Sequence, residues 1–136
     1  MRFRRLLTPA PRIPPPLGAG RYPVWGQIYL AGPPVQGERK RRVAVSPNAW
    51  NAISGMATFV RTTTSFDRHG PEFPQIQGGA ARACCGDVTT FEHGRVLLAP
   101  RDQPVPQVVT MRDMVAIGRG LVVTHELESA AARAAT

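Results

Sequence analysis

The sequence predicts a mainly β fold with a C-terminal helix, in which a small, strongly curved sheet forms a partly open barrel. Short apolar runs rich in β-branched and aromatic residues recur between residues 24 and 98, and Gly, Pro, Asn or Ser bounds them, as is typical of strands. After residue 109, apolar residues instead recur at helical spacing. At 136 residues, we expect one domain with a modest core.

The first half of the predicted sheet lies between Trp25 and Ser65. Its first strand carries Trp25, Ile28 and Leu30, with Gln27 and Tyr29 between them, and we expect Trp25 in the core. The run Val43–Val45 is short and uniformly apolar, so we expect it in the middle of the sheet. A helical turn at Asn48–Asn51, capped by Ser46, should lead into a third strand at Met56–Thr62.

The second half is expected to add three shorter strands and the helix. The strands are predicted around Phe73–Ile76 at a sheet edge, at Asp87–Phe91 and at Arg95–Leu98. Thr110 with Asp113 three residues later forms a capping-box-like helix start. Met114, Ile117, Leu121 and Val122 then share one helical face. Gly118 and Gly120 weaken this helix by about 1 kcal/mol each, and the Ala-rich end is expected to fray.

Residues 1–23 are rich in Arg and Pro and have no apolar periodicity. This composition predicts a poorly ordered tail, with the folded domain at residues 24–136. Two interpretations stay open at this point, a functional basic arm or a start codon placed too early.

The charge pattern favours a polyanionic partner. The formal net charge is +8, and sixteen of the seventeen cations are Arg. A GC-rich genome could produce this excess without any function. However, the cations bunch at Arg39–Arg42, between two predicted strands, and such a cluster attracts phosphate backbones. Nucleic acid is therefore the favoured partner, although a basic loop is also often just a solvated surface.

Other features of the sequence argue against several classes of protein. Cys84 and Cys85 are adjacent, without the spacing of a zinc site or of a disulfide framework, which favours buried fillers in a reducing compartment. No apolar run approaches the roughly 20 residues of a membrane span. The N-terminal segment also lacks the apolar region of a signal peptide. We expect a cytoplasmic protein that binds no membrane, no metal and no cofactor.

The order of these motifs resembles the MazF/PemK group of toxin endoribonucleases from toxin–antitoxin modules. The similarity covers roughly residues 24–127 and is carried by Ser46–Asn51, Val60–Ser65 and Cys85–Thr90. It implies a small SH3-like β-barrel with a terminal helix, the CcdB/PemK-like toxin fold. It also implies a homodimer that cuts single-stranded mRNA without a metal, and a small acidic antitoxin that covers the RNA groove. DNA would be contacted only through the toxin–antitoxin complex.

The resemblance also implies an active site. The family's catalytic Arg falls on Lys40 when counted without gaps and on Arg41 with one deletion, and the Pro that usually follows is missing. The catalytic Thr falls on Thr63, and Glu38 matches a loop acid that could act in proton transfer. The family's Asp position holds Gly86, with Asp87 one residue later. The expected substrate-binding residues are Thr64, Ser65, Arg61 and Trp50.

The chemistry agrees with this assignment. RNA cleavage by 2′-OH attack builds negative charge on the phosphoryl oxygens, which a fixed cation stabilises. Arg can donate two parallel hydrogen bonds to phosphate, and a Thr hydroxyl can donate a third. Trp50 could stack a base. A run of Thr on a strand is nevertheless usual β propensity.

Two other functions are compatible with the sequence. The first is a CcdB-like toxin that binds gyrase, and the second is a catalytically dead nucleic-acid-binding module with the same fold. The distinctive residues sit in the first loop and the third strand rather than at the C-terminal helix, which favours the endoribonuclease.

Overall fold

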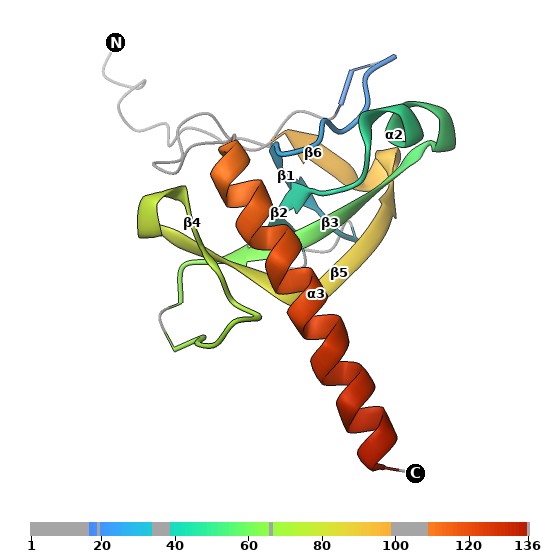
Figure 1. Cartoon of the computed structure of the whole chain (residues 1–136). Helices are drawn as coiled ribbons and strands as arrows, with labels where there is room; N and C mark the ends of the chain where they lie inside the picture. The colour runs from blue at the N-terminus through green and yellow to red at the C-terminus, as the bar shows by residue number, and fades with distance from the viewer. Residues whose placement is uncertain (1–16, 19, 34–38, 66, 99–108, 136) are drawn as a thin grey trace, which may run out of the picture.

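The computed structural model describes residues 17–18, 20–33, 39–65, 67–98 and 109–135. These residues form one curled six-stranded sheet in the order β4-β5-β3-β2-β1-β6, in which every neighbouring pair is antiparallel. The long helix α3 crosses the sheet and extends beyond it (Figure 1). The strands are β1 (Ile28–Ala31), β2 (Lys40–Ala44), β3 (Met56–Thr63), β4 (Gln75–Ile76), β5 (Ala81–Glu92) and β6 (Val96–Leu98). The predicted half-open barrel with a C-terminal helix is confirmed.

The core has two parts, one on each face of the curled sheet. Ile28, Val43 and Val60 pack with Met114 and Ile117 of α3 (Met111–Ala134). Alternate residues of the same strands, together with β6, form the second cluster. Its buried members include Tyr29, Ala31, Ala44, Phe59 and Val96 of β6. Because β2 lies between β1 and β3, both faces of its apolar run are covered. The predicted central position of this strand is confirmed.

The first strand differs from expectation in two ways. Trp25, expected in the core, lies in a turn before β1 and is 37% exposed, whereas Tyr29 is buried. The alternation of Ile28 and Tyr29 separates one core cluster from the other, rather than core from solvent. The Tyr29 hydroxyl is satisfied there, because it donates to Gln27 Oε1 and accepts from the Val24 N–H, each at 2.8 Å.

The helix α2 (Asn48–Ser54) connects β2 to β3. Its polarity is inverted, in that a polar side chain is buried and apolar side chains are exposed. Asn51 is fully buried, whereas Trp50 and Ile53 are exposed. Ser46 does not cap this helix, contrary to expectation. Its hydroxyl donates to Asn51 Oδ1 and accepts the Thr58 N–H at 2.8 Å, so it ties the helix to β3 instead.

The residues just before the predicted domain boundary also contact the barrel. Pro23 is buried and its carbonyl accepts from Asn51 Nδ2 at 2.8 Å. Leu17 packs against the second core cluster. Residues 1–16 and residue 19 of the predicted tail lie outside the described residues.

Helix α3 begins as expected and ends later than expected. The Thr110 hydroxyl accepts the Asp113 N–H at 3.1 Å, and Asp113 Oδ2 accepts the Thr110 N–H at 3.3 Å, which confirms the capping box. The helix then continues through the Ala-rich end to Ala134 instead of fraying. Alanine has the highest helix propensity, which accounts for this continuation. Within the described part of the chain, no helix has the length and apolarity needed to cross a membrane.

Candidate functional site

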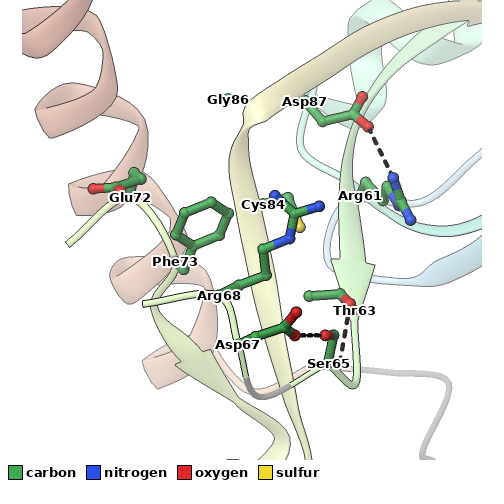
Figure 2. Close-up of a pocket in the computed structure, with 10 residues that line it drawn as sticks. All are labelled: Arg61, Thr63, Ser65, Asp67, Arg68, Glu72, Phe73, Cys84, Gly86 and Asp87. Atoms are coloured by element: carbon green, nitrogen blue, oxygen red, sulfur yellow. Dashed lines mark hydrogen bonds and ion pairs between the residues drawn. The ribbon is translucent and has the colours of Figure 1, made fainter. Parts of the chain in front are cut away.

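A pocket of about 490 Å³ opens between the end of β3, the middle of β5 and the loop that follows β3 (Figure 2). Its lining combines cations, hydroxyls, carboxylates and one aromatic ring. The lining residues are Arg61, Thr63, Ser65, Asp67, Arg68, Glu72, Phe73, Cys84, Gly86 and Asp87. Such a mixture suits a ligand that carries both anionic and planar apolar groups.

A β-bulge in β5 shapes the pocket floor. Val60 pairs with Val88, but the next residue of β3, Arg61, pairs with Cys84. The three residues Cys85–Asp87 are therefore left out of the register between the two strands. Bulges of this kind bend a strand and redirect side chains. Here the bulge brings Asp87 to Arg61, and Figure 2 shows these two side chains pointing toward one another.

Three charged side chains meet at this bulge. Arg42 Nη1 donates to Asp87 Oδ1 at 3.0 Å, and Arg61 Nη1 lies 3.9 Å from Asp87 Oδ2. The Arg42 side chain is 9% exposed, whereas that of Arg61 is 38% exposed. Arg42 is thus enclosed by the protein, and Arg61 is the cation of this group that faces the pocket.

The hydroxyls lie where β3 ends. The Thr63 hydroxyl oxygen accepts the Ser65 N–H at 3.1 Å, and the Ser65 hydroxyl donates to the Asp67 carboxylate. Because the backbone N–H uses an acceptor site of Thr63, the hydroxyl proton of Thr63 can still donate to a ligand. Arg68 comes from the same loop, and its side chain extends toward Cys84 (Figure 2). The pocket therefore offers two guanidinium groups near a hydroxyl donor.

The adjacent cysteines have different surroundings because they point to opposite faces of β5. Cys85 belongs to the core cluster, and its thiol donates to the Ile117 carbonyl oxygen at 3.7 Å. Burial raises the pKa of Cys85 to about 11. Cys84 instead lines the pocket. Burial raises the pKa of Cys84 as well, although the nearby charges of Arg61 and Arg68 oppose the shift.

The structure brings together only some of the residues predicted from the sequence. Arg61, Thr63 and Ser65 line the pocket, whereas Thr64 is exposed beside them. Trp50 lies on α2, which precedes the opposite end of β3. Glu38 lies outside the described residues.

Lys40 and Arg41 begin β2 and do not line the pocket. The Thr62 hydroxyl donates to the Arg41 carbonyl oxygen at 3.2 Å, which places the two strand ends side by side. Arg42 pairs with Arg61, so continuing this antiparallel register by two residues aligns Lys40 with Thr63. Partial burial lowers the pKa of Arg41 from its usual value.

Sequence reasoning missed the contributions of Arg42, Arg68 and Phe73. Asp87 had a signal, because it lies one residue from the position where the resembling family has its Asp. Arg68 and Phe73 sit in a loop, where no periodicity marks a residue that faces a pocket. Among the described residues, no group of three or more His, Cys, Asp or Glu side chains is arranged to hold a metal ion.

No family model matches the sequence, and no curated protein sequence matches it. Solved structures do match the fold. An endoribonuclease from a mycobacterial species superposes with a TM-score of 0.62 and 21% identity, over 78% of this chain and 93% of that one. A mycobacterial endoribonuclease in complex with its cognate antitoxin gives a TM-score of 0.61 and 21% identity, over 77% of this chain and 96% of that one.

MazF from Deinococcus radiodurans matches at a TM-score of 0.58 and 13% identity, over 78% of this chain and 98% of that one. The matches include a complex of MazE and MazF from the same organism. All these sequence identities lie below the level at which a shared function follows from similarity. The comparisons therefore show a shared fold and not a shared function. The chain has the fold of the MazF-type endoribonucleases.

Proposed function

We propose that this chain is the toxin of a toxin–antitoxin module and cleaves single-stranded mRNA in the cytoplasm. The observation that carries the proposal is the convergence of Arg61, Arg68 and Thr63 in one pocket on a fold shared with endoribonucleases. Two guanidinium groups can neutralise the oxygens of a phosphodiester, and the Thr63 hydroxyl can donate to one of them.

The proposed reaction is transesterification within the RNA. The 2′-oxygen attacks the adjacent phosphorus, the bond to the 5′-oxygen breaks, and a 2′,3′-cyclic phosphate forms that water can open to a 3′-phosphate. Arg61 and Thr63 would stabilise the charge that develops on the non-bridging oxygens. A pocket carboxylate or a water molecule accepts the proton of the 2′-hydroxyl. The leaving 5′-oxygen accepts a proton from water and becomes a 5′-hydroxyl.

Lys40 and Arg41 fit this proposal as cations at the edge of the site. The pairing of β2 with β3 ends at Arg42 and Arg61, and its continuation by two residues would align Lys40 with Thr63. An RNA strand that leaves the pocket past Thr63 would then meet this basic segment. Their role would be to bind flanking phosphates or, if Lys40 reaches the reacting phosphate, to assist Arg61. The pair is expected to be required for full cleavage.

The test is incubation of the purified full chain with a long single-stranded RNA, with and without EDTA. We expect cleavage that persists in EDTA, because the proposed charge stabilisation uses protein cations. Arg61→Ala and Thr63→Val should each lower kcat/KM about a hundredfold or more. Arg95→Ala, which removes an exposed Arg outside the pocket lining, is the matched control and should cut normally.

Each outcome of this experiment has a distinct meaning. Binding of RNA without cleavage would leave a nucleic-acid-binding module of the same fold. Normal cutting by Arg61→Ala and by the Lys40→Ala/Arg41→Ala double variant would place the active site elsewhere. Inactivity in EDTA would contradict the metal-independent mechanism.

The proposed partners follow from the same surface. A small acidic antitoxin would place carboxylates where phosphates sit, and its extended segment would block RNA by occupancy of a toxin homodimer. The complex, rather than the toxin alone, would contact DNA. Competition between the acidic peptide and a 2′-O-methyl RNA tests this, since simultaneous binding of both would contradict occlusion.

A further inference from the structure

The Arg42 side chain lies on the side of Asp87 away from the pocket, and it makes its contacts within the protein. Its Nε donates to the Ala31 carbonyl oxygen at 3.3 Å, and its guanidinium carbon lies 5.2 Å from the ring centroid of Phe91. Its Nη1 donates to Asp87 Oδ1 at 3.0 Å. A guanidinium enclosed to this degree requires a nearby carboxylate, because an unpaired buried charge is costly. Asp87 is that counter-ion.

The second oxygen of Asp87 faces the pocket cation. Asp87 Oδ2 lies 3.9 Å from Arg61 Nη1, which is too long for a hydrogen bond but within the distance of an ion pair. Asp87 is therefore held on one side by a charged hydrogen bond of 3.0 Å and attracts Arg61 on the other. The N–H donors of Arg61 are not consumed by this contact.

Without this carboxylate, the two arginines would repel one another. Arg42 and Arg61 are direct cross-strand partners on β2 and β3, so their side chains leave the sheet on the same face. Like charges directly opposite on one face of a sheet are destabilising. Removal of Asp87 would let the exposed member, Arg61, swing away toward solvent.

We propose that Asp87 is a positioning residue that holds the Arg61 guanidinium toward the pocket, with Arg42 as the anchor of Asp87. The proposal rests on the proposed function in one respect, namely that the ligand presented to Arg61 is an RNA phosphate. The β5 bulge is what places Asp87 between the two cations.

The first test measures the order of the Arg61 side chain by NMR of its Nε–H group, in the full chain without ligand. Arg61→Lys assigns the signal. In Asp87→Asn the heteronuclear NOE of Arg61 should fall toward that of exposed Arg95. Glu92→Gln removes one exposed carboxylate from the same strand and should leave the signal unchanged.

A double variant addresses the possibility that Asp87→Asn alone unfolds the protein. Arg42→Met/Asp87→Asn removes the enclosed charge together with its partner, which avoids an unpaired buried guanidinium. It should fold and still show a mobile Arg61. An Arg61 signal as ordered as that of the wild type in this variant would overturn the proposal.

The second test uses cleavage kinetics. Loss of a negative charge by itself should tighten RNA binding and lower KM, whereas loss of positioning should lower kcat. Asp87→Asn is expected to lower kcat about tenfold to a hundredfold, as small misplacements of catalytic groups do. Asp87→Glu keeps the charge and should recover part of the activity. In an Arg61→Ala background, Asp87→Asn should change kcat less than about twofold.

An equal loss of kcat with and without Arg61 would mean that Asp87 acts independently, and would overturn the inference. A wild-type chain that cuts no RNA would instead contradict the proposed function. In that case the NMR measurement alone decides whether Asp87 positions Arg61.

Discussion

Arg42 and Arg61 are directly opposed cross-strand partners with very different surroundings. Arg42 makes two hydrogen bonds and lies over the Phe91 ring, whereas Arg61 is partly exposed at the pocket. We predict that Arg42→Ala lowers the free energy of unfolding by about 2 kcal/mol, because it removes packing and leaves Asp87 without its hydrogen bond from Arg42. Arg61→Ala should change stability by less than about 0.5 kcal/mol. Urea denaturation of both variants measures this, and equal losses would contradict the division of roles.

The two glycines of α3 provide a matched pair for the packing of the helix. A Cβ at Gly120 would lie 2.6 Å from Cys85 Sγ and 3.1 Å from a ring carbon of Pro74, whereas one at Gly118 would meet nothing within 4 Å. Gly118→Ala should therefore stabilise the protein by up to about 1 kcal/mol through helix propensity. Gly120→Ala should destabilise it by about 1–3 kcal/mol through overpacking. Thermal unfolding of the two variants measures both effects. Stabilisation by both substitutions would show that α3 packs less closely on β5 than the distances at Gly120 indicate.

Phe73 is the aromatic residue of the pocket, and it offers a ring on which an RNA base can stack. Such stacking contributes about 1–3 kcal/mol per base. Phe73→Leu should therefore weaken binding of a 2′-O-methyl RNA about fivefold to a hundredfold, and Phe73→Trp should preserve it. Trp50→Leu, at the opposite end of β3, should have little effect. Fluorescence anisotropy with a labelled oligonucleotide measures the affinities. A larger loss of affinity in Trp50→Leu than in Phe73→Leu would show that Trp50 stacks the base instead.

The Cys85 thiol should make stability fall at high pH. Its pKa is raised from 9.0 to about 11 in the folded protein, so the folded state keeps the proton between these values while the unfolded chain loses it. Stability from this group is thus complete below pH 9 and is lost as the pH rises toward 11. The stability difference between the wild type and Cys85→Ala should narrow over the same interval. A constant difference from pH 8 to 11 would contradict this linkage.

Two N-terminal truncations distinguish the part of the predicted tail that contributes to stability from the part that does not. Removal of residues 1–16 should leave the melting temperature within about 2 °C of the wild type, because the segment has no pattern of core residues. Removal of residues 1–22 also deletes Leu17, which packs on the second core cluster, and should cost about 1 kcal/mol. Equal melting temperatures for both truncations would show that Leu17 contributes nothing.

Local patterns in the sequence were sufficient for much of the fold. The punctuation around Met56–Thr63 and the capping box at Thr110 depend on neighbouring residues, and both elements form where expected. Side-chain direction in β1 could not be read in the same way, because it depends on which faces the rest of the chain covers. The alternation that predicts one buried face fails where both faces are packed.

The candidate site was predictable only where it lies on regular strands. Arg61, Thr63 and Ser65 follow from the end of β3 and from the resemblance. The pairing of Asp87 with Arg42 joins residues 45 positions apart through a bulge. Gly86 is a local sign of a bulge in this strand. The length of the bulge and the partner that Asp87 meets depend on the register between β3 and β5, which is set by long-range pairing.

The inverted polarity of α2 has a spectroscopic consequence. The chain has two tryptophans. Trp50 lies on α2, and the backbone N–H of Trp25 donates to Asn48 Oδ1 at 2.7 Å at the start of the same helix. Both indoles are partly open to solvent. From Met56 to Thr63, β3 spans about 23 Å. Intrinsic fluorescence thus reports on the α2 end of the barrel, where iodide can quench it, and is insensitive to small ligands that fill the pocket at the other end.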